Sequence, residues 1–250
     1  MLAAGVAHAL GDRPPKKYEL VGNAKVCSDR AWSKIKAAGR TYSVDRRGYD
    51  EKTGLQNFWI GDHLFILPKG YMGQIGFGYA SDAPGISALF DLALPDMTPQ
   101  VKPGFKSIGD VGPYSIVRIS CDIRALVTVA WSSKTTKVGL LNLYIPSNKK
   151  YIERSLPELG LLGYSDEGGS HVVYFPANEK IRNPHGGALG INCMRAYPPK
   201  PESSDARCSI RYVLRDGISV DLGFPLQYLM YWQKSYESLL DLLNSSLQVK

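Results

Sequence analysis

The sequence RCSIRYVLRDGISVDLGF, residues 207–224, contains the clearest structural pattern of the chain. Apolar side chains occupy alternate positions on both sides of Asp216-Gly217, which is the pattern of two half-buried antiparallel strands. A three-residue loop, 215–217, places Leu214 opposite Ile218 and Cys208 opposite Phe224, so that both strands turn their apolar side chains to one face. We expect Gly217 to supply the positive φ that this loop needs.

A helix over about 226–247 follows this hairpin. Its apolar residues recur at steps compatible with 3.6 residues per turn, and they are Leu226, Leu229, Trp232, Tyr236, Leu239, Leu240, Leu243 and Leu247. A helix after several antiparallel strands predicts an α+β fold: antiparallel and β-rich, with the C-terminal amphipathic helix packed on one face of a sheet.

Other segments with strand character lie on both sides of the chain's midpoint. The longest alternates from Val117 to Trp131, and we expect a bend or hairpin near 121–124. The remaining candidates are 58–67, 73–80, 138–145, 171–176 and 188–195. Residues 81–113 are rich in proline, glycine and aspartate and are interpreted mostly as loop, and 151–170 as irregular.

A short helix is predicted near the N-terminus. Ser28 is the expected cap of a helix that starts at Asp29, with Trp32 and Ile35 on one face and Gly39 at its end. Pro146 to Lys150 is the best internal boundary. We therefore expect an α+β domain over 18–250, with two similar halves meeting near 146–156 as an alternative organisation.

The N-terminus and the cysteines indicate export. Ala7-His8-Ala9 fits a signal-peptidase site, so residues 1–10 are interpreted as a signal-peptide remnant, or else as a disordered tail. Cys27, Cys121, Cys193 and Cys208 make an even number without the spacing of a zinc site. Four cysteines allow three pairings into disulfides. Cys193 and Cys208 both lie on the apolar face of a predicted strand, which favours the disulfide Cys193–Cys208 and leaves Cys27 to pair with Cys121.

Composition excludes two broad classes of protein. The chain has 250 residues, 44% of them hydrophobic and 21% charged, which is globular and not disordered. No apolar run approaches the 18 residues of a membrane-spanning helix. The net charge is +7, but the basic residues are scattered, which is typical of a solvated surface.

The sequence carries no strong catalytic signature. Gly163-Tyr164-Ser165-Asp166-Glu167 lacks the final glycine of a nucleophile elbow. Asp62-His63 is a possible oriented imidazole, and His171 with His185 lacks metal-ligand spacing. Residues 40–49 hold interleaved arginines and tyrosines, the best local case for nucleic acid. We predict no catalytic residue, metal or cofactor and no nucleic-acid partner.

Residues 207–224, with the following Leu229, Trp232 and Leu239-Leu240, resemble the closing hairpin and helix of exported immunity proteins that neutralise phospholipase effectors of type VI secretion. The segment from Asp62 to Tyr71 is similar to the opening strand, proline and glycine of such proteins. The resemblance covers about a third of the chain. It implies a periplasmic inhibitor in a Gram-negative bacterium, whose partner is a cognate secreted effector with phospholipase activity, inhibited by steric occlusion.

Long loops on a disulfide-stapled scaffold are the expected contacts with such a partner. The candidates lie in loops 45–54 and 164–170, and they are Arg46, Arg47, Tyr49, Asp50, Tyr164, Asp166 and Glu167. Two other functions stay open: a periplasmic ligand-binding or envelope-assembly module, and a hydrolase centred on His63 or His171.

Overall fold

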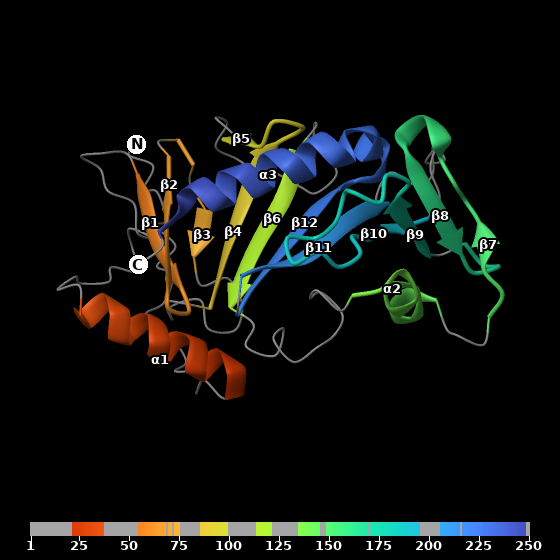
Figure 1. The fold of residues 1–250 in the computed structure, drawn as a ribbon. Coiled ribbons are helices and arrows are strands. Elements are labelled where there is room, and N and C mark those ends of the chain that lie inside the picture. Colours follow the sequence, from red (N-terminus) through yellow and green to blue (C-terminus); the bar gives the residue numbers. More distant parts are fainter. Residues whose placement is uncertain are drawn as a thin grey trace, which may run out of the picture.

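The computed structural model describes residues 22–37, 55–68, 70–71, 73–75, 86–99, 114–121, 135–145, 149–169, 171–195, 206–215 and 217–248 (Figure 1). These residues form mostly antiparallel strands with a C-terminal helix packed on them. The predicted α+β class is therefore confirmed. None of the helices in these ranges is long and apolar enough to cross a bilayer.

A ten-stranded antiparallel sheet forms the body of the molecule. Its strands lie in the order β3 (Gly73–Ile75), β4 (Ser87–Ala93), β6 (Tyr114–Cys121), β12 (Ile218–Pro225), β11 (Arg207–Arg215), β10 (Ile191–Met194), β9 (His171–Pro176), β8 (Leu161–Ser165) and β7 (Ile152–Glu153), and β5 (Thr98–Pro99) pairs with β4. Strands from both sides of residues 146–156 thus belong to one sheet. The organisation into two similar halves stays a prediction.

A second, three-stranded sheet pairs the hairpin of residues 56–67 with a strand that follows the C-terminal helix. The hairpin of β1 (Gln56–Ile60) and β2 (His63–Leu67) receives β13 (Leu247–Gln248), with Leu247 opposite Phe65. Phe58 and Phe65 stack in the main core, with their ring centroids 5.3 Å apart. The small sheet therefore closes one end of the core that the large sheet provides.

The C-terminal helix covers one face of the large sheet. A 3-10 turn (Leu226–Tyr231) precedes α3 (Trp232–Ser246), so the predicted helix over 226–247 is divided at its start. In Figure 1, α3 crosses the strands diagonally. Trp232 donates a hydrogen bond from Nε1 to the Leu159 carbonyl at 3.0 Å, and Tyr236 donates one from Oη to the Arg182 carbonyl at 2.9 Å. These bonds satisfy polar atoms of otherwise buried rings.

The segment predicted as a strand over 138–145 is instead a helix, α2 (Lys137–Tyr144). The Thr136 hydroxyl accepts a hydrogen bond from the Gly139 N–H and caps its first turn. Leu140 and Leu141 bury against β9 on the face of the sheet opposite α3. A short apolar run does not distinguish strand from helix by periodicity, and the Thr136 cap decided this one.

Helix α1 (Gly22–Ala37) begins earlier than predicted, so Ser28 is a buried position inside it and not its cap. Ala31 and Ile35 pack on Trp59, whereas Trp32 is 42% exposed. Trp32 lies one turn from Ile35 on the helix surface but does not share its burial. The predicted end at Gly39 falls outside the described residues.

Three strand expectations also need correction. The single strand predicted over 58–67 is the β1–β2 hairpin, which turns at Gly61-Asp62. Residues 87–93, predicted within a loop, form β4, with Ala88, Phe90 and Leu92 buried at alternate positions. Within 151–170, β7 and β8 replace the irregular segment. Local proline and glycine content hid these short alternations. Strand β6 ends at Cys121, and residues 122–130 lie outside the described ranges.

The hairpin of residues 207–224 has the predicted register over most of its length. Cys208 lies opposite Phe224 and Tyr212 opposite Val220, and Gly217 has the expected positive φ of 77°. Near the turn, a bulge shifts the pairing so that Arg215, and not Leu214, lies opposite Ile218. The bulge adds a residue to β11 and re-aims the side chains that follow it.

Two disulfides hold the fold together, and both are the favoured pairings. Cys193–Cys208 joins the neighbouring strands β10 and β11, and Cys27–Cys121 joins α1 to the end of β6. The chain separations are 15 and 94 residues, respectively. The second disulfide also contacts the β1–β2 turn. A Cβ atom added to Gly61, whose φ is +55°, would lie 3.1 Å from the Cys121 sulfur.

Removing either disulfide by a double cysteine-to-alanine change should destabilise the protein. The chain-entropy model gives about 3 kcal/mol for a loop of 15 residues and between 4 and 5 kcal/mol, roughly, for one near 100 residues. Urea unfolding of both double variants measures the two losses. A larger loss for Cys193/Cys208 than for Cys27/Cys121 would contradict this ordering.

Gly61→Ala should cost more stability than Gly160→Ala. Both glycines have left-handed backbones, with φ of +55° and +63°, but only Gly61 faces the disulfide, because nothing lies within 4 Å of a Cβ at Gly160. The backbone strain is about 1 kcal/mol at each site, and the close contact adds roughly 1–2 kcal/mol at Gly61. Equal losses in urea unfolding would show that the turn does not press on the disulfide.

Candidate functional site

One cleft lies where α1, the β1–β2 turn, the β11–β12 hairpin and β13 meet. Its volume is about 230 Å³. The residues that line it come from four separate parts of the chain: Lys34, Trp59, Asp62, His63, Leu64, Arg215 and Gln248. The cleft therefore depends on the tertiary arrangement of both sheets and α1, and no local motif defines it.

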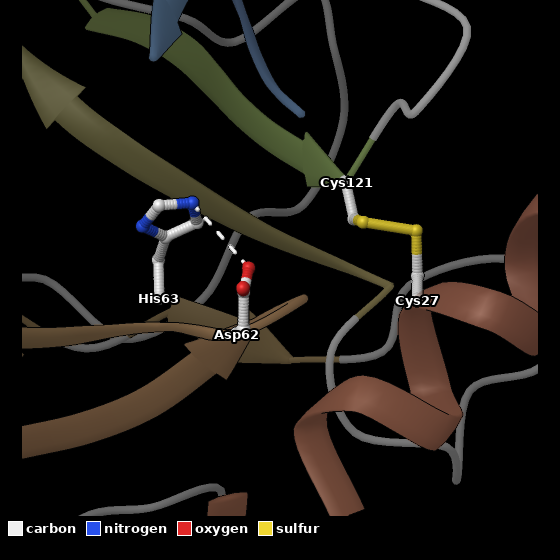
Figure 2. Close-up of a disulfide and its surroundings, with 4 residues drawn as sticks. All are labelled: Cys27, Asp62, His63 and Cys121. Carbon is white, nitrogen blue, oxygen red and sulfur yellow. Dashed lines mark ion pairs between the residues drawn. A yellow bond between two sulfur atoms is a disulfide. The ribbon is translucent and has the colours of Figure 1, made fainter. Parts of the chain in front are cut away.

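The β1–β2 turn places Asp62 and His63 in this cleft. Two residues, Gly61 and Asp62, connect the strands, and glycine with positive φ in the first of these positions suits a tight hairpin turn. Asp62 Oδ1 lies 3.5 Å from His63 Nε2. Figure 2 shows the two side chains beside the Cys27–Cys121 disulfide. Asp62 and His63, the pair that the hydrolase hypothesis requires, thus lie in contact within this cleft.

A hydrolytic centre would also need a nucleophile that the imidazole activates. The residues that line the cleft include no serine, threonine or cysteine. The nearby sulfurs of Cys27 and Cys121 are joined to each other. Within the described residues, Asp62 and His63 therefore form a charged and hydrogen-bonding rim without a side-chain nucleophile beside it.

Among the described residues that line the cleft, cations outnumber anions. Lys34 and Arg215 contribute positive charge and Asp62 contributes the carboxylate. Trp59 and Leu64 supply the apolar part of the wall, and Trp59 is held from behind by Ala31 and Ile35 of α1. The site thus offers an apolar wall beside positive charge, a combination that suits the stem and the carboxylate of an acidic side chain.

A second cleft, of about 240 Å³, lies at the start of α2. Its walls include Lys137 and Glu179, whose charged groups lie 3.3 Å apart and offset each other. Small-molecule sites typically have roughly 300–1,000 Å³. Both clefts are smaller than that, so neither has the size expected for an enclosed ligand site.

The predicted contact residues of the β8–β9 turn lie together at the other end of the large sheet (Figure 1). Tyr164 is partly buried, with its ring 6.3 Å from that of Phe175. Asp166 is 15% exposed and pairs with Lys149 at 3.5 Å, while Glu167 is exposed. Only Glu167 of the three is thus fully available to a partner. Arg46, Arg47, Tyr49 and Asp50 fall outside the described residues.

His171 and His185, the other two histidines considered as possible site residues, lie in separate environments. His171 stacks on Tyr144, with ring centroids 6.3 Å apart. His185 lies in a turn, where its backbone N–H donates to Asn183 Oδ1 at 2.9 Å. In the ranges that the structure describes, no three histidine, cysteine, aspartate or glutamate side chains gather as a metal site would require.

Shifted ionisation constants in the core have a structural cause. Burial raises the pKa of Tyr212 well above its ordinary value, and burial also raises the pKa of Tyr236. Their rings meet edge to face at 5.4 Å beneath α3. These tyrosines lie in the core between the sheet and α3, so their shifts report packing and do not mark the cleft.

Sequence reasoning missed Lys34, Trp59 and Arg215 as parts of one site. Trp59 lies in a segment predicted as one continuous strand, and Arg215 was assigned to a turn. No local pattern announces the bulge that redirects Arg215. The Asp62-His63 dipeptide was the one sequence feature that indicated a site in this cleft.

No protein-family model matches the chain, and no curated protein sequence matches it either. A solved structure with a similar fold is that of an immunity protein of the Stenotrophomonas maltophilia type IV secretion system. The match covers 79% of this chain and 94% of that one, with a TM-score of 0.50 and 16% sequence identity. At this level of identity, the match establishes a shared fold.

Proposed function

We propose that this protein is an exported immunity protein, which binds a cognate toxic effector of a bacterial secretion system and blocks it sterically. The observation that carries the proposal is the fold shared with an immunity protein over 94% of that protein's length. The hairpin and helix that resemble immunity proteins in sequence form β11, β12 and α3.

Two further features support export and binding. Both disulfides bridge separate elements of the fold, which suits an oxidising compartment such as the periplasm of a Gram-negative bacterium. The net charge of +7 favours rapid association with an acidic partner, since complementary charge accelerates the encounter of two proteins. Steric inhibition requires no catalytic group in the inhibitor.

The type of secretion system that delivers the toxin is a finer question than membership in the immunity-protein class. The sequence resemblance is to immunity proteins against type VI phospholipase effectors, whereas the structural match belongs to a type IV secretion system. The two kinds of immunity protein share the task of neutralising a secreted toxin. A phospholipase is the first activity to assay in the captured partner, and loops 45–54 and 164–170 remain the proposed contacts.

Neither alternative function gains a specific observation from the described residues. A ligand-binding module would need a larger enclosed cavity than the two clefts provide. A hydrolase centred on His63 would need a nucleophile that the cleft lining does not supply. His171 packs against Tyr144, as a structural histidine would.

The proposal predicts that the exported protein forms a stoichiometric complex with the toxin encoded in the same gene cluster. We expect the two chains to co-elute in gel filtration after co-expression in the periplasm and the toxin's enzymatic activity to fall to background at a molar ratio of one. The control is a toxin variant with its active-site residue replaced, which should bind equally well.

Separate elution of the two chains, with full toxin activity at a tenfold molar excess of this protein, would contradict the proposal for that pair. Protection by a reduced form that lacks both disulfides would instead contradict the proposed oxidising compartment, because the fold depends on two bridges that form there.

A further inference from the structure

The geometry points to the cleft around Arg215 as the socket for an acidic side chain, aspartate or glutamate, on the surface of the effector. This inference rests on the proposed immunity function and adds to the proposed loops one further, chemically defined contact with the partner. It concerns the end of the molecule away from the β8–β9 turn.

Arg215 reaches the cleft because of the bulge in β11. In an uninterrupted register, Leu214 would lie opposite Ile218, and Arg215 would belong to the loop. The bulge places Arg215 opposite Ile218 instead, and Ile218 in turn lies opposite Cys121 on β6. Arg215 is therefore brought to the strand ends beside the Cys27–Cys121 disulfide, where the β1–β2 turn packs. Bulges often serve to redirect a side chain in this way.

The positive charge of the cleft is not neutralised by the ion pairs of the described residues. Lys25, Lys137, Lys149, Arg211 and Lys234 each lie within 4 Å of a carboxylate oxygen. Neither Lys34 nor Arg215 belongs to any of these pairs, and the one carboxylate of the cleft, on Asp62, is adjacent to His63. Among the described residues, Lys34 and Arg215 are therefore not engaged in an ion pair that an external carboxylate would have to displace.

The size and wall of the cleft favour a side chain over a larger molecule. About 230 Å³ is below the range of small-molecule pockets but accommodates one protruding side chain. Trp59 and Leu64 provide apolar contact for its methylene groups, and the planar guanidinium of half-buried Arg215 can bind both carboxylate oxygens. Reduced exposure to water strengthens such a pair relative to one on an open surface.

The scaffold around the socket is rigid. Gly61 permits the hairpin turn to touch the Cys121 sulfur, and the disulfide fixes α1, which carries Lys34, to β6. On the remaining side, Gln248 belongs to β13, which is paired with β2. Because the backbone elements that carry the lining residues are tied together before the partner arrives, binding does not have to order them.

The socket is tested first without the effector. The full chain is titrated with blocked glutamate, N-acetyl-glutamate methylamide, and the backbone, indole and imidazole resonances are followed by NMR. We expect the largest shifts at Trp59, His63 and Gln248, and an affinity about tenfold above that for the glutamine analogue. Equal shifts with both compounds, or no shifts at these residues, would overturn the inference.

Charge reversal then identifies the responsible cations. Arg215→Glu and Lys34→Glu should each remove the glutamate response, whereas Lys180→Glu should preserve it. The Lys180→Glu variant changes the net charge by the same amount, but Lys180 is an exposed residue of the turn after β9 and does not line the cleft. Lys34 is exposed on α1, so its variant is expected to fold and keeps the test valid if Arg215→Glu is unstable.

The same variants are finally compared in the complex with the captured toxin. We expect Arg215→Glu to weaken binding about 10- to 100-fold, with Lys180→Glu unchanged, and an acidic-to-arginine change on the toxin to restore it. If the unaltered protein captures no toxin, the proposed function fails. If it captures the toxin and Arg215→Glu and Lys34→Glu bind like Lys180→Glu, the socket alone is wrong. A loss seen only with Glu167→Lys would place the contact at the β8–β9 turn instead.

Discussion

The ten-stranded sheet buries one of its faces beneath α3, and this burial fixes where the neighbouring elements can lie. Strand alternation places Ile119, Val220 and Ile210 on that face, and all three have no exposed surface. Burial of such side chains contributes roughly 25 cal/mol per Å² of apolar surface removed from water. Because α3 lies along this face, the residues that follow it reach β2 and pair with it as β13. The small sheet, and with it the cleft, exists as a result.

The cleft itself arises where this packing ends. The last residues of β6 and the turn of β11–β12 form one edge of the core, and the β1–β2 turn closes against the Cys27–Cys121 disulfide there (Figure 2). A bulge beside a core edge removes regular pairing and frees a long side chain to face outward. Arg215 illustrates this effect: its neighbours Leu214 and Ile218 stay buried, while its own side chain lines a solvent-accessible site.

Elements whose pattern is long and unambiguous could be predicted from the sequence. The alternation in residues 207–224 predicted β11 and β12 with their register away from the turn. The 3.6-residue periodicity after them predicted a helix packed on the sheet. The shared apolar parity of Cys193 and Cys208 predicted their disulfide. In each case, local propensity and tertiary burial favour the same structure.

The predictions were wrong for elements whose short sequence pattern suits two kinds of structure. The apolar run at 138–145 suits a strand or a helix, and the cap on Thr136 decides for the helix. Residues 87–93 alternate, but their surroundings favoured a loop. The candidate site was the least predictable part, since Lys34, Trp59 and Arg215 meet only through a bulge and a disulfide of long separation. Such contacts depend on the completed fold.

An immunity protein must protect living cells from its toxin. A sensitive bacterial strain is made to export the toxin encoded beside this protein, and its growth is measured with this protein exported, retained in the cytoplasm or absent. We expect growth to be restored by the exported form alone, since both the disulfides and the encounter with the toxin require that compartment. Equal killing with and without the exported protein, at matched amounts of folded protein, would show that this protein does not neutralise that toxin.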